Sequence, residues 1–457
     1  MKIFYEDTIA AISTPFAQGG IGTIKISGPN AKLVAKSVFT PVNKATNIEK
    51  LGGYRAVFGH VFDVKRGILD EAVLLNFNMP KSYTGENVVE LSVHSGLFIL
   101  KQLLRSVFAA GARPAEPGEF TRRAFLNGKL TLTQAEAVMN LVSANSEQAH
   151  NAALQIKQGK LCEKIHKESK VLLNVLGHVA AFIDYPEEVD PVNLKSIDSE
   201  IAQVINKLTE LLSGYEAGKM INEGISVSVV GKPNVGKSTI VNLLLGLERC
   251  IVTDVPGTTR DVIEESIIFD GVVVRLADTA GIRQTDDVVE NMGVKLALNK
   301  LAQSFLVLAV FDASRPLDEL DEQVFHEIVD KKHVIAIINK MDLPNRLDIT
   351  QIEKCATQII KGTTHNEHFR EEIVAAIRLK LMPGLHLGCV PANERQYNCV
   401  SRAVTQLQKV KKLLLNGSLD VASVELENAL EVLNELNGEN ISDLILDDIF
   451  GRFCVGK

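Results

Sequence analysis

The chain has 457 residues, of which 46% are hydrophobic, and a formal net charge of −7 at pH 7. This length exceeds what one hydrophobic core supports and predicts two to four domains. The negative charge excludes a protein that is basic over its whole surface, so any RNA contact needs a local patch or a partner. The six cysteines form no C-x-x-C pair, which argues against a zinc site or a disulfide framework. With no signal-peptide pattern and no membrane-length apolar run, we expect a cytoplasmic protein without membrane contact.

Residues 1–120 combine short strand patterns with two helical patterns, which predicts an α+β domain. We expect Gly19 and Gly20 to separate the first two strands. Lys25, Glu90 and His94 are polar residues within strand patterns, and such residues more often face solvent or form hydrogen bonds than bind ligands. The expected strands are 7–14, 21–27, 57–64, 72–77 and 88–94, and the expected helices are 31–39 and 97–110.

Residues 121–216 show helical periodicity instead. A helix is expected to start near Thr133, and the amphipathic patterns that follow are typical of a helix bundle. Asp184–Pro191 interrupts the pattern before it resumes at 197–212. Helical patterns return after residue 383, at 394–415, 421–436 and 441–450.

A phosphate-binding loop is predicted at Gly231-Lys-Pro-Asn-Val-Gly-Lys-Ser-Thr239, between a strand pattern at 225–230 and a helical pattern at 240–245. The loop's N–H groups and the positive end of the helix suit a polyphosphate. We expect Lys237 to reach the β- and γ-phosphates and the Ser238 hydroxyl to bind Mg²⁺. The alternative is a glycine-rich turn without a ligand, which the complete pattern disfavours.

Two later motifs indicate which nucleotide binds. Asp278-Thr-Ala-Gly281 follows a strand pattern at 271–277, where a carboxylate suits the Mg²⁺ shell and a glycine N–H suits the γ-phosphate. Asn339-Lys-Met-Asp342 follows a strand pattern at 333–338 and resembles the base-reading motif of GTPases. Its aspartate would accept hydrogen bonds from guanine N1–H and N2–H₂, and adenine offers no such donors. We therefore expect GTP rather than ATP.

The order of these patterns predicts a multidomain protein. An α+β N-terminal domain (1–120) precedes one helical domain in two segments (121–216 and 381–457), into which an α/β P-loop GTPase domain (217–380) is inserted. Insertion is plausible because domain termini often lie close together. The last residues, 453–457, look like a short tail that delivers a side chain.

The phosphate loop, Gly257-Thr-Thr-Arg-Asp261 and the two later motifs together resemble the TrmE-Era-EngA group of GTPases. Flanking segments narrow this resemblance to the MnmE (TrmE) family of tRNA-modification GTPases, over essentially the whole chain. They include Asp7-Thr-Ile-Ala10, Gly19-Gly-Ile-Gly22, Ser82-Tyr-Thr-Gly-Glu86, Pro117-Gly-Glu-Phe-Thr121, Arg123-Ala-Phe-Leu-Asn-Gly-Lys-Leu130, Gln134-Ala-Glu-Ala137, Asp184-Tyr-Pro-Glu-Glu188 and Cys454-Val-Gly-Lys457.

The resemblance implies a homodimer that works with the flavin-dependent MnmG (GidA). Together they would build an aminomethyl or carboxymethylaminomethyl group on C5 of wobble uridine 34 of certain tRNAs. Folate would supply a carbon, and GTP hydrolysis would drive or time the cycle.

The resemblance also implies that the N-terminal domain dimerises and binds 5-formyl-tetrahydrofolate or a related folate at Lys25, Glu90, Lys129 and Lys457. A glutamate suits the N–H donors of a pterin, and lysines suit the carboxylates of folate. Lys25 replaces the family's usual arginine, so it keeps the charge but loses the bidentate fork. Cys454 matches a C-terminal cysteine that is either a nucleophile or a packed thiol.

In the GTPase domain, Ile282 stands where many GTPases carry a glutamine and cannot position water. The family places K⁺ against the β- and γ-phosphates, implying Asn234, Thr253, Val255 and Thr258 as ligands. Ser238 and Thr259 would bind Mg²⁺. Glu290 matches the family's catalytic acidic residue and would act on the attacking water through a second water, and Arg283 is a candidate for contacts across the dimer. The implied nucleotide site is Asn234, Val235, Gly236, Lys237, Ser238, Thr239, Thr253, Asp254, Val255, Pro256, Gly257, Thr258, Thr259, Asp278, Thr279, Ala280, Gly281, Asn339, Lys340, Met341 and Asp342.

Other interpretations compete with parts of this assignment, and one loop departs from the family's pattern. Read alone, Glu290 would more often lie on a solvated helix. Gln358–Thr364 lacks the Ser-Ala pair of the family's last base-contacting loop. The chain as a whole could be a GTP-dependent switch in ribosome assembly, like Era or EngA, or a folate-dependent one-carbon transferase that the GTPase part regulates.

Overall fold

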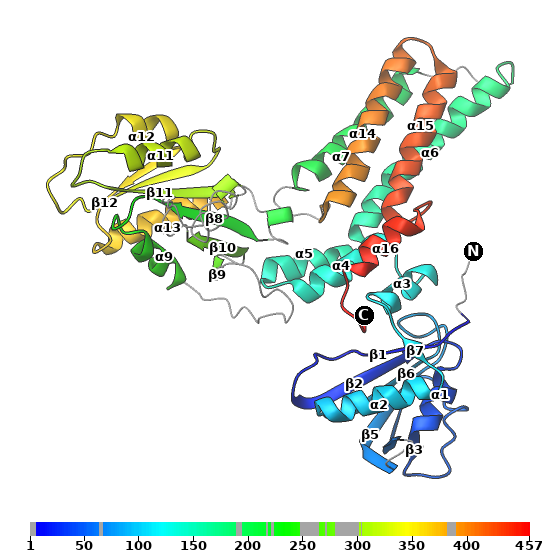
Figure 1. The fold of residues 1–457 in the computed structure, drawn as a ribbon. Helices are drawn as coiled ribbons and strands as arrows, with labels where there is room; N and C mark the ends of the chain where they lie inside the picture. The colour runs from blue at the N-terminus through cyan, green and yellow to red at the C-terminus, as the bar shows by residue number, and fades with distance from the viewer. Residues whose placement is uncertain are drawn as a thin grey trace. The chain divides into compact units, whose positions relative to one another are not determined.

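The computed structural model describes residues 6–63, 67–188, 194–215, 218–220, 224–246, 265–269, 272–278, 301–302, 304–381 and 390–457 (Figure 1). The chain divides into two compact units. Unit 1 comprises Met1–Met139, Ile156–Asn206 and Asn398–Lys457, and unit 2 comprises Asn140–Gln155 and Lys207–Tyr397. The domain boundaries at 120, 216 and 380 stay predictions. Among the helices of the described ranges, none is long and apolar enough to cross a membrane.

Unit 1 begins with a seven-stranded sheet in the order β3-β4-β5-β6-β2-β1-β7, antiparallel except for the β1–β7 pair. The α+β prediction is confirmed, but Gly19 and Gly20 lie inside β2 rather than between strands. Helices α1 and α2 pack on the sheet over a shared apolar core. The elements are β1 (Ile9–Ile12), β2 (Gly19–Ser27), α1 (Ala31–Val38), β3 (Phe39–Pro41), β4 (Arg55–Asp63), β5 (Gly67–Phe77), β6 (Val88–Ser95), α2 (Leu97–Ala109) and β7 (Arg113–Pro114).

The helical segments form as their periodicity predicts. Helix α6 buries one apolar stripe, which includes Leu161, Ile165 and Leu172, and it lies along α15 (Figure 1). Near the C-terminus, α16 packs against α3 through an apolar cluster around Phe450. The helices are α3 (Glu119–Leu126), α4 (Leu132–Ser143), α5 (Glu147–Lys157), α6 (Lys160–Asp184), α7 (Leu194–Ser213), α14 (Glu394–Leu415), α15 (Leu419–Asn437) and α16 (Asp443–Gly451).

Unit 2 contains a six-stranded sheet in the order β13-β12-β11-β8-β10-β9. It is parallel except for the edge strand β9, which pairs antiparallel with β10. The elements are β8 (Ile225–Val230), α9 (Lys237–Leu245), β9 (Glu265–Phe269), β10 (Val272–Asp278), β11 (Leu306–Asp312), α11 (Glu319–Ile328), β12 (Val334–Asn339), α12 (Thr350–Cys355), β13 (Gln358–Lys361) and α13 (Glu367–Leu381).

Strand β11 explains the continuous apolar run in the sequence, because all seven of its residues are buried. Leu308 and Val310 join a core shared with α9 and α13, whereas Ala309 and Phe311 join a second core shared with α11 and α12. A strand whose two faces are both covered by helices needs no alternation of polar residues. The predicted doubly wound sheet is therefore confirmed.

Candidate functional site

The predicted phosphate loop joins β8 to α9. Gly231 has a φ of +146°, and a Cβ at this position would collide with the carbonyl O of Val310 in β11. Gly236 has a φ of +107°, and a Cβ there would collide with Nδ2 of Asn339. Both positions need glycine because the backbone is left-handed and the neighbours are close. Helix α9 begins directly after Gly236, so its first-turn N–H groups carry positive partial charge at the loop.

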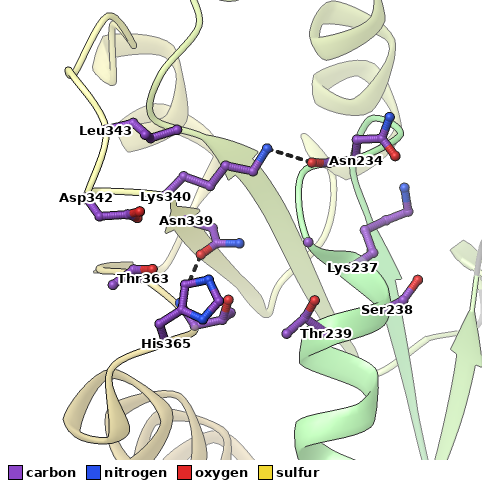
Figure 2. A pocket seen from close by; sticks show the side chains of 12 residues that line it. Asn234, Lys237, Ser238, Thr239, Asn339, Lys340, Asp342, Leu343, Thr363 and His365 are labelled. Carbon is purple, nitrogen blue, oxygen red and sulfur yellow. Dashed lines mark hydrogen bonds between the residues drawn. The ribbon is translucent and has the colours of Figure 1, made fainter.

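Two consecutive residues at the end of β12, Asn339 and Lys340, hold the backbone of the phosphate loop in place. The Asn339 amide donates to the carbonyl O of Val235 at 2.9 Å. The Lys340 ammonium donates to the carbonyl O of Asn234 at 2.7 Å (Figure 2). It also pairs with Asp312 at 2.6 Å. Lys340 and Asn234 both have a φ of +63°, which is uncommon outside glycine. The segment predicted to read the base thus also fixes the loop.

The first turn of α9 presents a cation and two hydroxyls. Lys237 Nζ donates to the carbonyl oxygens of Gly231 at 2.8 Å and Lys232 at 2.7 Å. Ser238 and Thr239 follow on the same turn and are exposed. A polyphosphate here would meet an ammonium group, hydroxyls and a helix N-terminus. A hydroxyl oxygen beside phosphate oxygens is also a donor set that suits Mg²⁺.

A further lysine of the loop was not predicted to matter. Lys232 Nζ pairs with Asp318 at 2.9 Å and with Asp321 at 2.5 Å, at the start of α11. The hydrogen bond from Lys232 lowers the pKa of Asp318, whereas burial raises the pKa of Asp321. These ion pairs tie the loop to α11, and no local sequence pattern connects residues so far apart.

The atypical stretch Gln358–Thr364 lies against the base-reading segment. Its first residues form β13, beside β12. The N–H of Thr364 donates to Oδ1 of Asn339 at 3.2 Å, and the N–H of Met341 donates to the carbonyl O of Gly362 at 3.1 Å. The lack of a Ser-Ala pair therefore does not keep this loop away from Asn339.

These three segments surround a pocket of about 460 Å³. This volume lies in the range of roughly 300–1,000 Å³ that is common for small-molecule sites. Figure 2 shows Asp342 and Thr363 on one side of the pocket and Lys237 and Ser238 on the other. An exposed carboxylate therefore faces the same space as the phosphate loop, at a distance along the pocket.

Several predicted site residues lie outside the described residues. Asp278, by contrast, ends β10, whose backbone pairs with β8 beside the phosphate loop. Of the predicted potassium ligands, only Asn234 is described, and it lines the pocket. The residues outside the described ranges are Thr253, Asp254, Val255, Pro256, Gly257, Thr258, Thr259, Thr279, Ala280, Gly281, Ile282, Arg283 and Glu290.

Unit 1 brings together three of the four predicted folate residues. Lys25 on β2 pairs with Glu90 on β6 at 3.7 Å, and its Nζ lies 5.5 Å from the ring centroids of both Tyr83 and Phe120. Burial lowers the pKa of Lys25, the Glu90 carboxylate raises it, and the positive charge of Lys457 lowers it further. We call these five residues the lysine cluster. A lysine beside two aromatic faces, a carboxylate and a second lysine can bind a ligand with both rings and carboxylates.

The fourth predicted folate residue, Lys129, and the C-terminal tail are held by separate backbone contacts. Lys129 Nζ donates to the carbonyl O of Pro80 at 3.1 Å. The C-terminal tail lies against the end of β1, since a Cβ at Gly456 would collide with the carbonyl O of Ile12. Gly456 also has a φ of +97°, which favours glycine. This close approach brings Lys457 to Lys25, whereas the Cys454 side chain is exposed.

Unit 1 also contains a buried ionic network that the sequence did not reveal. Arg123, whose side chain is fully buried, pairs with Asp7 at 2.8 Å, Glu119 at 2.9 Å and Glu86 at 3.2 Å. Glu86 also accepts a hydrogen bond from Ser27 at 2.7 Å. The network joins α3, β2 and the turn before β6. Its residues fall within segments that carried the family resemblance but had no assigned chemistry.

Comparison with known proteins decides the family. A model described as the GTP-binding protein TrmE N-terminus matches residues 8–129, and one described as the MnmE helical domain matches residues 132–454. A tRNA modification GTPase MnmE of Acetivibrio thermocellus is 37% identical, and one of Geobacter metallireducens is 39% identical. Each alignment covers all of both chains. This chain belongs to the MnmE family.

Membership of the MnmE family confirms the resemblance drawn from the motifs and makes the protein a tRNA modification GTPase by family. Among solved structures, Era of Aquifex aeolicus bound to GDP and aluminium fluoride is 25% identical. The match covers 40% of this chain and 66% of that one with a TM-score of 0.27, a score that adds nothing to the MnmE assignment.

Proposed function

We propose that this MnmE-family protein is a potassium-stimulated GTPase of tRNA wobble-uridine modification. With the flavoprotein MnmG (GidA), it would form the C5 aminomethyl or carboxymethylaminomethyl group of uridine 34, using a folate one-carbon unit. The observation that carries this proposal is the pocket in which the phosphate loop, Asn339–Asp342 and Thr363–His365 meet, within a chain that matches MnmE relatives over its full length.

The residues that line the pocket support separate roles in GTP binding and hydrolysis. Lys237 and the N-terminus of α9 would neutralise the phosphates, while Ser238 would bind Mg²⁺ together with Thr259 and Asp278. Asp342 would accept hydrogen bonds from the guanine. Mg²⁺ and K⁺, when bound, would supply positive charge at the β- and γ-phosphates, and Glu290 would orient the attacking water.

The lysine cluster supports a folate site in unit 1. Lys25 and Lys457 offer positive charge to carboxylates, Glu90 offers acceptors to pterin N–H groups, and Lys129 would add a further positive charge. We include homodimerisation through the N-terminal domain and a cytoplasmic location in the proposal.

Mass spectrometry of wobble nucleosides tests the proposal. Cells that lack the protein should lose the C5 modification, and the wild-type chain should restore it whereas Glu290→Ala should not. Unchanged nucleosides in the deletion strain would contradict the proposed function and would favour the ribosome-assembly switch.

The role of potassium can be measured on the purified chain. GTP hydrolysis should be much faster in KCl than in NaCl, because a larger cation suits the oxygen ligands of Asn234 and the loop 253–258. Asn234→Ala should abolish this difference, and Lys36→Ala on α1 should preserve it. Equal rates in both salts for the wild type would exclude potassium stimulation.

A further inference from the structure

The N-terminal half of α6 carries a row of exposed lysines. Lys160, Lys164 and Lys167 recur at i, i+4 and i+7 and therefore share one face of the helix. Lys170 lies one turn further on, and Lys157 ends the preceding helix α5. We call these five residues the α6 lysine row. All five residues are exposed, and none belongs to the apolar stripe that α6 buries.

Four residues of the α6 lysine row lack the ion pairs that Arg402 and Lys411 form on α14, whereas Lys164 has an interaction partner. Arg402 pairs with Glu435 at 2.9 Å, and Lys411 pairs with Asp198 at 3.4 Å. Across the described ranges, no carboxylate lies at ion-pair distance from Lys157, Lys160, Lys167 or Lys170.

Like charges one helical turn apart repel each other, so this arrangement does not serve the stability of the helix. Two acids occur between residues 160 and 170. Glu163 is exposed and Glu168 is buried, so the exposed face keeps a positive excess. A local positive surface in a protein of net charge −7 attracts a polyanion to one place, while the rest of the molecule does not bind polyanions non-specifically.

We propose that the α6 lysine row is a docking surface for the phosphate backbone of tRNA. The inference rests on the proposed function, which makes tRNA the polyanion that this protein meets. Lysine ammonium groups act as point charges on phosphates and carry no base code. The surface therefore holds and orients the tRNA, and it leaves the choice of tRNA to other contacts.

Binding of an unmodified tRNA transcript to the full chain tests this assignment. Lys160→Gln/Lys167→Gln removes two charges and keeps good helix formers. We expect its Kd for tRNA to rise about tenfold at about 0.1 M salt, and the slope of log Kd against log salt to fall by up to about 1.8. Lys409→Gln/Lys412→Gln removes two exposed lysines from α14 instead, and its Kd should stay within about twofold of wild type.

Comparison of the two variants distinguishes tRNA binding at the α6 lysine row from non-specific attraction by lysines elsewhere on the protein. Equal losses in both would show attraction by overall charge, and no loss in the α6 variant would exclude the row; either result overturns the proposal. So does a wild-type chain that binds no tRNA. GTP hydrolysis and the unfolding midpoint should be unchanged in both variants. Failure of the proposed function would appear separately, as intact wobble modification in the deletion strain.

Discussion

The nucleotide pocket of unit 2 and the lysine cluster of unit 1 are built from different materials. Backbone forms the pocket: glycines press the phosphate loop against its neighbours, and Asn339 and Lys340 hold its carbonyl groups. Side-chain charge forms the cluster through the Lys25–Glu90 pair, and a buried ionic network around Arg123 lies in the same unit. The pocket should therefore be sensitive to added volume, and the cluster and the Arg123 network to lost charge.

The largest effect is expected from Arg123→Met. This change leaves Asp7, Glu86 and Glu119 without their shared buried cation, and breaking a buried ion pair costs about 3–5 kcal/mol. Urea unfolding of the full chain should show this loss as a lower midpoint for unit 1. The neighbouring Arg122→Met is the control, because Arg122 is partly exposed and pairs with an exposed Asp447. It should lose no more than about 1 kcal/mol. If both variants lost the same free energy of unfolding, the effect would come from the packing of α3 and not from the buried ion pairs.

The same network predicts a pH dependence. Burial by itself would raise the pKa of Glu119, but hydrogen bonds from Arg113 and Arg123 outweigh burial and lower it. A carboxyl whose pKa is lowered on folding stabilises the protein above its unfolded pKa, and this stabilisation is lost as pH falls through the lowered value. The stability difference between wild type and Arg123→Met should thus be full at neutral pH and shrink below about pH 4. A difference that is constant down to acid pH would contradict an electrostatic role.

An added methyl group should be nearly as damaging in the pocket. Gly236→Ala would place Cβ against the Asn339 amide at a φ of +107°, so the loop must move. We expect GTP affinity to fall about 100-fold, which corresponds to about 2.7 kcal/mol. Gly246→Ala at the other end of α9 is the control, because its φ is −74° and its nearest contacts are 3.4 Å away. Fluorescence titration with a labelled nucleotide measures both. An unaffected Gly236→Ala would show that the loop does not need this approach.

The contrast between the regions also explains what the sequence could predict. The phosphate loop and Asn339–Asp342 are contiguous motifs at strand ends, so their chemistry is visible without a structure, and the apolar run of β11 predicted its burial. Lys25, Glu90 and Lys457 are distant in sequence. The residues alone favoured a solvated or hydrogen-bonded role for Lys25 and Glu90, and they gave Lys457 only a place in a tail that delivers a side chain. Only the family resemblance joined them.

Other features of the structure could not be predicted from the sequence, for physical reasons. The Arg123 network joins charges up to 116 positions apart, and the Lys232 pairs depend on where α11 begins. Pairings set by tertiary contact leave no periodic pattern in the sequence.

The smallest effect is expected at Lys25. If the lysine cluster binds folate, Lys25→Gln should weaken binding of 5-formyl-tetrahydrofolate about tenfold, or about 1.4 kcal/mol, because a charge-assisted bond to a carboxylate is lost. Lys25→Arg should bind at least as tightly as wild type, because a guanidinium can bind the carboxylate with two N–H groups. Calorimetric titration measures both, with Lys36→Gln as a control from an exposed pair on α1. If Lys25→Gln binds folate normally, the Lys25–Glu90 pair only joins β2 to β6. Any folate site of unit 1 must then lie away from the Lys25–Glu90 pair.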